Sequence, residues 1–271
     1  MTTTFDFTGQ HVAVFGGTTG INFGIASAFA DRGARVTIVS RKQENVDGAL
    51  AVLRERGAVA QGMTADVRDF DAVGQTFAAA CKTFGPVDVL VSGAAGNFLA
   101  EANQLSSNGF KVVVDIDLNG TFHVMRQAFA YLSKPGASVI NITAPQAVIP
   151  MRYQSHVCAA KAGVDQLTRV LAIEWGGAGV RVNAISPGPI AGTEGMRRLA
   201  PEGHEEEGSF VQQRVPLGRL GTADDIANLA MFLGSSAASY ISGAIVPCDG
   251  GGAIDSVKPM IETAGANLNA T

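Results

Sequence analysis

Two charged residues interrupt apolar helical stripes, and they are the first candidates for chemistry. Asp117 lies in the stripe of the segment 106–133 and Lys161 in that of the segment 153–175. A charge on a buried face is costly unless it is paired or has a function. We therefore predict that these opposite charges meet between two helices, either as a structural bridge or as a catalytic pair. The stripes consist of Phe110, Val114, Asp117, Thr121 and Met125, and of Val157, Lys161, Val164, Leu171 and Trp175.

The elements that position this pair follow from an alternating pattern along the chain. Short apolar runs alternate with helix-length segments, which is typical of parallel strands covered on both faces. We predict an α/β fold with a single Rossmann-type, doubly wound parallel sheet of about seven strands and helices on both faces. The predicted strands are His11–Phe15, Arg35–Ser40, Ala58–Thr64, Val87–Ser92, Ser138–Ile142, Val180–Ile185 and Ala244–Pro247, and the predicted helices are 21–32, 43–56, 71–84, 106–133, 153–175 and 224–234.

Composition limits the class of protein. The 271 residues are 46% hydrophobic and 16% charged, with a net charge of −4, which excludes a disordered chain and argues against a duplex nucleic-acid binder. We expect no membrane span, no signal peptide, no peroxisomal address at the end of the chain and no metal site. Three distant cysteines are typical of reduced thiols, so we expect a cytoplasmic protein.

A glycine-rich turn follows the first predicted strand and opens the first helix. Glycines at this junction let backbone N–H groups approach a pyrophosphate at a helix N-terminus. An ordinary tight turn is the alternative. Asn22 stands where such turns usually have a third glycine, and its side chain could narrow the space near a dinucleotide. The predicted contacts of this turn are Gly16, Thr18, Gly20 and Ile21.

The next strands indicate which dinucleotide binds. The second strand ends in Ser40 and Arg41, which suit a 2′-phosphate, whereas an acid there would bind a ribose 2′-hydroxyl. We therefore favour NADP(H) over NAD(H), with a solvated Arg41 as the alternative. Asp66 and Val67 end the third strand, where Asp66 can accept from the adenine amino group. Small residues after the fourth strand let the backbone approach the adenosine ribose, namely Ala94 and Gly96.

Three further features are Lys161 within Ala159–Gly163, the segment Asn183–Gly188 and the segment Asp249–Gly251. All these features together resemble the short-chain dehydrogenase/reductase family over residues 8–252. The resemblance implies one NADP(H)-binding Rossmann domain over 1–252, with a substrate lid around 189–219 and a tail over 253–271. It also implies a homotetramer formed through the helices 106–133 and 153–175. Its implied cofactor contacts near the nicotinamide are Lys161, Pro187, Gly188, Ile190 through its backbone, and Thr193 on the phosphates.

The chain departs from the usual catalytic set of that family, which is Ser, Tyr and Lys. The Tyr position holds Val157 and the Ser position holds Ala144, and neither side chain can donate a proton. Thr143 lies one residue too early, and Tyr153 lies eight residues before Lys161. An ordinary keto/alcohol mechanism is therefore in doubt, unless Tyr153 swings into the site.

A branch of the family that lacks this Tyr, the 2,4-dienoyl-CoA reductases of the peroxisomal type, is more similar. The matching runs are Ala94–Leu99, Val114–Asp117, Gly120–Phe122, Asn141–Ala144 and Ile185–Leu199. This resemblance implies NADPH-dependent reduction of 2,4-dienoyl-CoA thioesters to 3-enoyl-CoA in unsaturated fatty acid oxidation. Its implied catalytic residues are Asp117 and Lys161, with Asn119 as an oxyanion donor or merely a surface residue.

An acyl-CoA substrate carries phosphate charges that local cations must meet. The implied substrate contacts are Arg68 and Arg198, beside Arg41, with Phe98, Ser106, Ser107 and Asn108 along the acyl or pantetheine path. For His156 we favour a neutral packing role over catalysis. Two alternatives stay open: another short-chain reductase of enoyl or keto substrates that uses Tyr153, and a non-catalytic NADP-binding scaffold.

Overall fold

The computed structural model describes residues 5–193, 196 and 215–254, and its centre is one parallel sheet. Seven strands lie in the order β3-β2-β1-β4-β5-β6-β7, with every neighbouring pair parallel, which confirms the predicted fold class. The strands are β1 (His11–Phe15), β2 (Arg35–Ser40), β3 (Ala60–Thr64), β4 (Val89–Ser92), β5 (Ser138–Ile142), β6 (Arg181–Pro187) and β7 (Ile245–Cys248).

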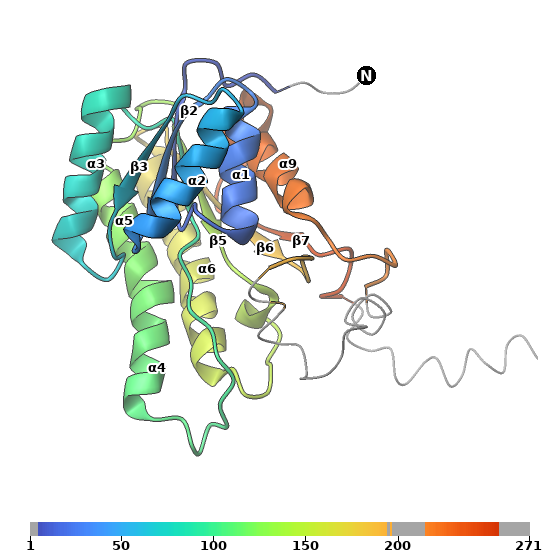
Figure 1. Ribbon diagram of the computed structural model, residues 1–271. Coiled ribbons are helices and arrows are strands. Elements are labelled where there is room, and N and C mark those ends of the chain that lie inside the picture. The colour runs from blue at the N-terminus through green and yellow to red at the C-terminus, as the bar shows by residue number, and fades with distance from the viewer. Residues whose placement is uncertain (1–4, 194–195, 197–214, 255–271) are drawn as a thin grey trace, which may run out of the picture.

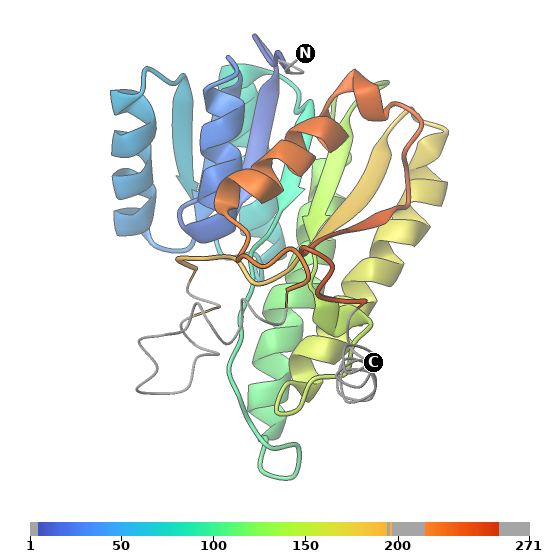
Figure 2. The same cartoon turned by 90° about the vertical axis from the view of Figure 1, so that its right-hand side faces the viewer.

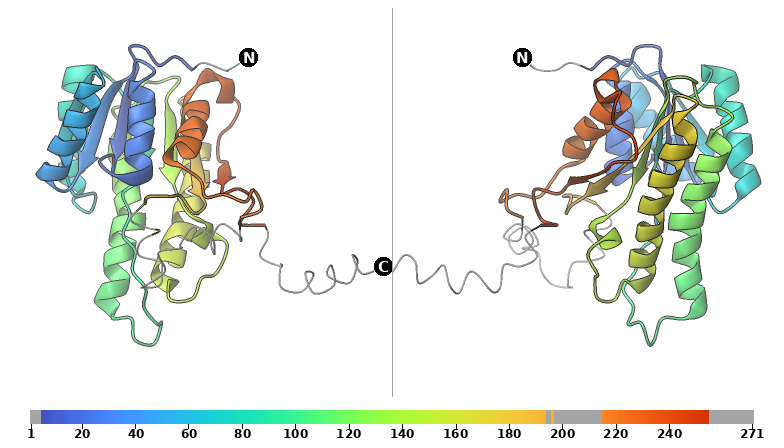
Figure 3. Two further views of the ribbon diagram at one scale, coloured as in Figure 1. Left: turned by 45° about the vertical axis from the view of Figure 1, so that its right-hand side comes forward. Right: turned by 180° about the vertical axis from the view of Figure 1, so that it is seen from behind.

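Helices cover both faces of this sheet (Figures 1 and 3). Helices α1 (Gly20–Ala30), α2 (Gln43–Glu55) and α9 (Ala223–Gly234) lie on one face, where Phe29, Leu53 and Ile226 are buried in one core cluster. Helices α3 (Phe70–Phe84), α5 (Gly120–Ala128) and α6 (Ser155–Gly176) lie on the other face, where Phe77 and Val124 belong to a second cluster. The apolar runs predicted as buried strands are therefore covered from both sides.

The strand order reverses between β1 and β4, because β1 pairs with β2 on one side and β4 on the other. A crevice at the carboxyl ends of the strands at such a switch point is where open α/β sheets bind ligands. Figure 2 shows α4 (Ser107–Val114) and the first turns of α6 projecting beyond this edge of the sheet. The residues that come together at this edge are those for which chemistry was predicted.

The helix predicted over 106–133 is present as one continuous helical run over 107–128, but it contains a π-helical turn that the sequence pattern did not predict. The structure has α4, a π-helical turn η1 (Asp115–Asn119) and α5, and residues 129–133 no longer belong to a helix. The Gly120 N–H bonds to the Asp115 carbonyl five residues back, and the Thr121 hydroxyl donates to the Asp117 carbonyl at 2.7 Å. Such turns widen a helix locally and are frequent at functional sites. Phe110, predicted as part of the buried stripe, is 40% exposed on the projecting α4.

Two predicted segments lie mostly outside the described residues. Only the two ends of the predicted lid, 189–193 with 196 and 215–219, are described, and the predicted tail is described as far as Ile254. None of the helices in the described part of the chain is both long and apolar enough to cross a membrane. The described residues also contain no cluster of three or more His, Cys, Asp or Glu side chains that could hold a metal ion.

Candidate active site

The carboxyl end of β1 turns into α1 through glycines that leave a cradle between two loops. Gly16 has a φ of +77°, and a Cβ on it would lie 3.0 Å from the Ala94 nitrogen, in the loop after β4. The missing side chain of Gly20 faces open space, where the nearest atom is the Thr193 methyl at 3.9 Å. Because α1 has no side-chain cap, its first N–H groups can bind a pyrophosphate. This cradle fits a dinucleotide.

Asn22, at the position of a third glycine, turns its side chain inward, toward the end of β4. Its side-chain amide donates to the Gly93 carbonyl at 2.8 Å, and a Cβ on Gly93 would collide with the Asn22 amide oxygen at 2.3 Å. The side chain therefore ties α1 to the end of β4. Thr18 and Ile21, the other predicted contacts of this turn, are half-buried beside it.

Charged residues after β2 and β3 form one edge of the crevice. The Arg68 guanidinium donates to both oxygens of Asp66, with Nη2–Oδ2 at 2.6 Å and Nε–Oδ1 at 3.0 Å. These hydrogen bonds, with a smaller contribution from Arg41, hold the pKa of Asp66 below its ordinary value. Arg41 is exposed and makes no hydrogen bond or ion pair with a described residue. The predicted adenine acceptor therefore has Arg68 bound to it, while Arg41 faces solvent beside the half-buried Ser40.

The π-helical turn η1 carries Asp117 into the interior, where its side chain is 1% exposed. One carboxylate oxygen, Oδ1, accepts from the Gly96 N–H at 2.7 Å. The other, Oδ2, has no hydrogen-bond partner in the described part of the chain. The turn is pressed onto Val67 after β3, because a Cβ on Gly120 would lie only 2.6 Å from the Val67 side chain. Asp117 is thus held through one oxygen, while the other is buried without a hydrogen-bond donor from a described residue.

Lys161, on α6, faces this second oxygen of Asp117. Its Nζ lies 3.4 Å from Asp117 Oδ2, and its side chain is 7% exposed. The same Nζ donates to the Ile142 carbonyl at the end of β5, at 3.1 Å. The predicted pair of opposite charges therefore forms between η1 and α6. An ammonium group has three donors, and the one hydrogen bond that it makes with a described residue is that to Ile142, so Lys161 retains donors for a hydroxyl of a bound ligand.

The positions of the missing Ser and Tyr are apolar in the structure as well. Val157 is buried at 3% exposure, and Ala144 is half-buried before a short 3₁₀ turn. Tyr153 has a φ of +65°, its carbonyl accepts from the Ala100 N–H at 2.9 Å, and its side chain is half-exposed. No hydroxyl of the usual catalytic set therefore stands beside Lys161.

His156 packs against Phe98, with ring centroids 4.5 Å apart, and is fully buried. Burial lowers the pKa of His156, against the opposite influence of the Phe98 backbone and the Asp117 charge. A buried, neutral imidazole agrees with the packing role favoured from the sequence. Phe98 itself is 37% exposed, so one part of its ring is open to a ligand.

Asn119 does not join the pair. Although only two residues from Asp117, it is exposed, and its side-chain amide donates to Asp115 at 3.0 Å on the outer side of η1. The geometry therefore favours the surface alternative stated above. Two residues along a helical turn differ in direction by roughly 200°, which is why proximity in sequence did not bring Asn119 inward.

The other predicted substrate contacts lie at the start of α4. The Ser106 hydroxyl caps this helix by accepting from the Gly109 N–H at 3.0 Å. Ser107 and Asn108 are exposed on its first turn. Arg198 lies outside the described residues.

The chain after β6 holds the predicted nicotinamide end. Pro187 is buried, and the Gly188 N–H donates to the Cys248 carbonyl at 3.0 Å. Ile190 is 2% exposed, and its carbonyl accepts from the Thr193 hydroxyl at 2.9 Å. This segment and the Gly16–Gly20 turn meet at Thr193, so the structure brings both ends of a dinucleotide site to one edge.

Sequence patterning missed Asp165, which is 3% exposed on α6. Burial raises the pKa of Asp165, against the opposite influence of Thr143, Arg169 and Lys161. Its spacing of four residues from Lys161 is the signal that reveals it, since residues four apart lie on one helix face. A second carboxylate therefore lies one helical turn behind the Lys161 ammonium.

Comparisons with known proteins agree with this architecture. A family model described as "Enoyl-(Acyl carrier protein) reductase" matches residues 16–252. A peroxisomal 2,4-dienoyl-CoA reductase of Arabidopsis thaliana, named as (3E)-enoyl-CoA-producing, is 42% identical and is aligned over 90% of this chain and 84% of its own. A Bacillus subtilis protein, "Probable 2,4-dienoyl-CoA reductase [(2E)-enoyl-CoA-producing]", is 38% identical over 89% and 95% of the two chains. A crystal structure of a short chain dehydrogenase from Bacillus anthracis matches with a TM-score of 0.81 at 38% identity, covering 90% and 96%.

The sheet, the phosphate cradle and the lysine on α6 define an oxidoreductase that uses a nicotinamide cofactor, NAD or NADP. The chain belongs to the short-chain dehydrogenase/reductase family. Within that family it departs from the usual catalytic set, because a buried Asp–Lys pair stands where a Tyr and a Ser are absent.

Proposed function

We propose that the protein reduces 2,4-dienoyl-CoA thioesters to 3-enoyl-CoA with NADPH. The observation that carries this proposal is the Asp117–Lys161 pair, which lies buried where the family usually has a Tyr beside its Lys. Relatives at about 40% identity over most of the chain carry the name 2,4-dienoyl-CoA reductase, which supports the same substrate class.

The chemistry of a dienoyl thioester suits a site without a phenol. The reduced nicotinamide supplies a hydride, which C5 of the conjugated chain accepts. The charge then delocalises to the thioester oxygen, and a proton delivered at C2 leaves the remaining double bond between C3 and C4. This reaction needs oxyanion stabilisation and a proton source away from the carbonyl, not an acid beside a ketone.

Each member of the pair has a role in this proposal. Lys161 holds the nicotinamide ribose with a donor that the bond to Ile142 leaves free, and its positive charge stabilises the oxyanion. Asp117 keeps Oδ2 available, so it can orient a water molecule and move a proton through it to C2. The Gly96 N–H fixes the other oxygen and so the direction of the carboxylate.

Several finer proposals complete the function. NADP(H) is the cofactor, supported by the exposed Arg41 where the ribose 2′-phosphate would lie. The protein is a homotetramer in the cytoplasm, supported by exposed apolar side chains on the helices expected at the interfaces and by its free cysteines. Arg68 and Arg198 bind CoA phosphates. The exposed apolar side chains are Phe110, Phe122, Val170 and Ile173. Sedimentation of the purified protein tests whether four subunits associate.

The direct experiment measures NADPH oxidation with 2,4-hexadienoyl-CoA and 2,4-decadienoyl-CoA, beside ketone and alcohol controls. We expect turnover of the dienoyl thioesters alone, with 3-enoyl-CoA as the product on mass spectrometry and NMR. A 2-enoyl product would place the proton at C4 and contradict the role of Asp117. No turnover of either dienoyl thioester would overturn the proposed function.

A further inference from the structure

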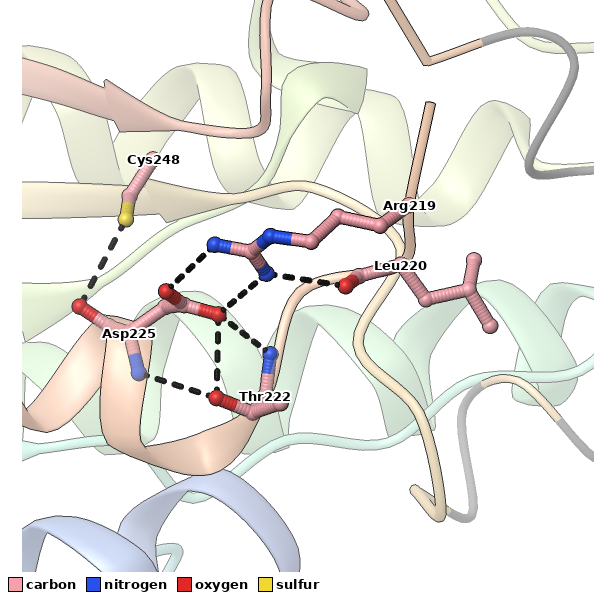
Figure 4. Close-up of polar contacts among 5 residues, drawn as sticks. All are labelled: Arg219, Leu220, Thr222, Asp225 and Cys248. Atoms are coloured by element: carbon pink, nitrogen blue, oxygen red, sulfur yellow. Dashed lines mark hydrogen bonds and ion pairs between the residues drawn. The ribbon is translucent and has the colours of Figure 1, made fainter. Parts of the chain in front are cut away.

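A clamp of hydrogen bonds stands next to the nicotinamide end of the site, and it joins Arg219, the last residue of the predicted lid, to residues for which no function was predicted (Figure 4). Arg219 donates to both oxygens of Asp225, Nη2 to Oδ1 and Nη1 to Oδ2, each at 2.8 Å, and Nη1 also reaches the Leu220 carbonyl at 3.0 Å. Asp225 Oδ2 accepts from the Thr222 N–H at 2.7 Å, in the capping box that starts α9. The backbone on both sides of Gly221 is therefore bound to one guanidinium–carboxylate pair.

Gly221 in turn holds the segment after β6. Its N–H donates to the Pro189 carbonyl at 3.0 Å, and the Ala191 N–H donates to the Gly221 carbonyl at 2.9 Å. Gly221 thus forms a parallel bridge to the segment and bonds to the residues on either side of position 190. In such a bridge the residue at the centre directs its own N–H and C=O away from the bridging strand. That residue is Ile190, whose carbonyl bonds to the Thr193 hydroxyl and whose N–H has no partner among the described residues.

The same clamp is fixed to the sheet through β7. The Cys248 thiol contacts the Asp225 carbonyl at 3.7 Å, and the Cys248 carbonyl accepts from Gly188. Contact between Gly221 and Ile190 is close, because a Cβ on Gly221 would lie 2.5 Å from Ile190 Cδ1. A shift of Gly221 is therefore transmitted directly to the backbone groups of Ile190.

We propose that Arg219 is a positioning residue for the nicotinamide ring: by holding Gly221 through Leu220 and Asp225, it sets the direction of the Ile190 N–H and C=O toward the carboxamide. Arg219 touches neither ring nor substrate and acts only through this ladder. The inference rests on the cofactor part of the proposed function and adds to it a residue that controls one half of the dinucleotide. Hydrogen bonds from Arg219 also lower the pKa of Asp225, which keeps its carboxylate charged.

The side chains of Arg219 and Asp225 are 54% and 31% exposed, and their bidentate geometry also stabilises the fold. A purely stabilising role would affect all ligands of the protein equally. The geometric role makes a different prediction: loss of Arg219 displaces the carboxamide contacts and leaves the phosphate cradle intact. The affinity for the whole dinucleotide then falls, whereas the affinity for a fragment without nicotinamide does not.

The experiment compares two probes on the full chain by calorimetry or fluorescence: NADPH, and ADP-ribose 2′-phosphate, which lacks the nicotinamide. For Arg219→Met we expect NADPH to bind between about tenfold and a hundredfold more weakly, the range reached when a positioning contact is lost, and the fragment to bind within about twofold of wild type. Arg219→Lys restores little, since an ammonium cannot hold both oxygens of Asp225 and the Leu220 carbonyl. In Gly221→Ala the added methyl group displaces Ile190 directly, so we expect the same result: weaker binding of NADPH and unchanged binding of the fragment.

Arg56→Met is the matched control, because Arg56 also forks onto an exposed carboxylate, that of Asp31, at the ends of α1 and α2 remote from the crevice. We expect it to bind both probes as wild type does. Equal loss of both probes in Arg219→Met, or no loss of either, would overturn the inference. Wild-type protein that binds neither NADPH, NADH nor the fragment would overturn the cofactor assignment as well. If Arg219→Met weakens the binding of NADPH but not of the fragment, and the wild-type protein reduces no dienoyl thioester, only the proposed substrate is overturned.

Discussion

The Asp117–Lys161 pair allows a double-mutant cycle that separates a catalytic pair from a structural bridge. We expect Asp117→Asn and Lys161→Met each to destabilise the fold and to abolish reduction of dienoyl thioesters. Each single change leaves one buried charge without its partner, since the Lys161 side chain is only 7% exposed and that of Asp117 only 1%. The double variant removes both charges, so it is expected to regain stability and to remain inactive.

The magnitude follows from the geometry. At 3.4 Å and an effective dielectric constant of about 20, the attraction is about 5 kcal/mol before desolvation is subtracted. Removing one partner of a buried pair costs about 3–5 kcal/mol of unfolding free energy. The Asp117→Asn variant keeps a side-chain oxygen that can accept from the Gly96 N–H. We therefore expect its loss of unfolding free energy to lie near the lower end of this range. Asp117→Ala loses that bond too and is expected to cost about 1–3 kcal/mol more.

The assay combines urea unfolding of all four proteins with NADPH binding and dienoyl-CoA turnover. A coupling free energy of at least about 3 kcal/mol is expected, because each single variant should lose at least that much and the double variant should be no less stable than either single variant. Recovered turnover in the double variant would show that the pair is only a structural bridge. Additive destabilisation, with no coupling, would refute the argument that these two charges depend on each other.

Three further predictions concern the cofactor, the alternative acid and the buried carboxylate. Arg41→Ala should weaken NADPH binding by about 10- to 100-fold, the effect of one charge-assisted hydrogen bond, and leave NADH binding unchanged; equal effects on both would contradict a 2′-phosphate contact. Tyr153→Phe should retain dienoyl-CoA turnover, because its side chain is half-exposed outside the pair, and lost turnover with intact NADPH binding would favour the enoyl or keto reductase alternative. The folded-state pKa of Asp165 is raised above its ordinary 3.8, so its favourable contribution exists below that pH and is lost as the pH rises through the raised value. Asp165→Asn should therefore be more stable than wild type at neutral pH but not at acidic pH in urea unfolding, and an unchanged pH profile would contradict this.

The sheet could be predicted because its strands are continuous apolar runs and its helices are apolar on one side. The π-helical turn within the segment 106–133 could not, because its cause is tertiary. The π-helical turn at Asp115–Asn119 fits against Val67, where Gly120 leaves room that any larger residue would fill. Hydrophobic spacing of about 3.6 residues does not record this contact. The sequence nevertheless identified Asp117, since one charge in an apolar stripe is visible whatever the helix type.

Residue types identified the charged members of the site but not the groups that orient them. The Gly96 N–H and the Ile142 carbonyl fix Asp117 and Lys161, and every residue carries such groups, so no pattern of side chains distinguishes them. Asp66 and Arg68 show the opposite case. Their positions in the sequence predicted a separate ligand for each. In the structure the Arg68 guanidinium donates hydrogen bonds to the Asp66 carboxylate. Their separation of only two residues could have indicated this contact.

The loop after β4 connects the cofactor cradle to the Asp117–Lys161 pair. Gly93 is tied to Asn22 in α1, Ala94 limits the side chain at Gly16, and the Gly96 N–H holds Asp117. Four consecutive residues therefore set both the depth of the cradle and the direction of the carboxylate. If Asp117 transfers the proton as proposed, a displacement of this loop by a larger residue at Gly93 changes dinucleotide binding and proton transfer together. In a site without the usual Tyr, the loop is thus a shared support of the cradle and of the Asp117 carboxylate.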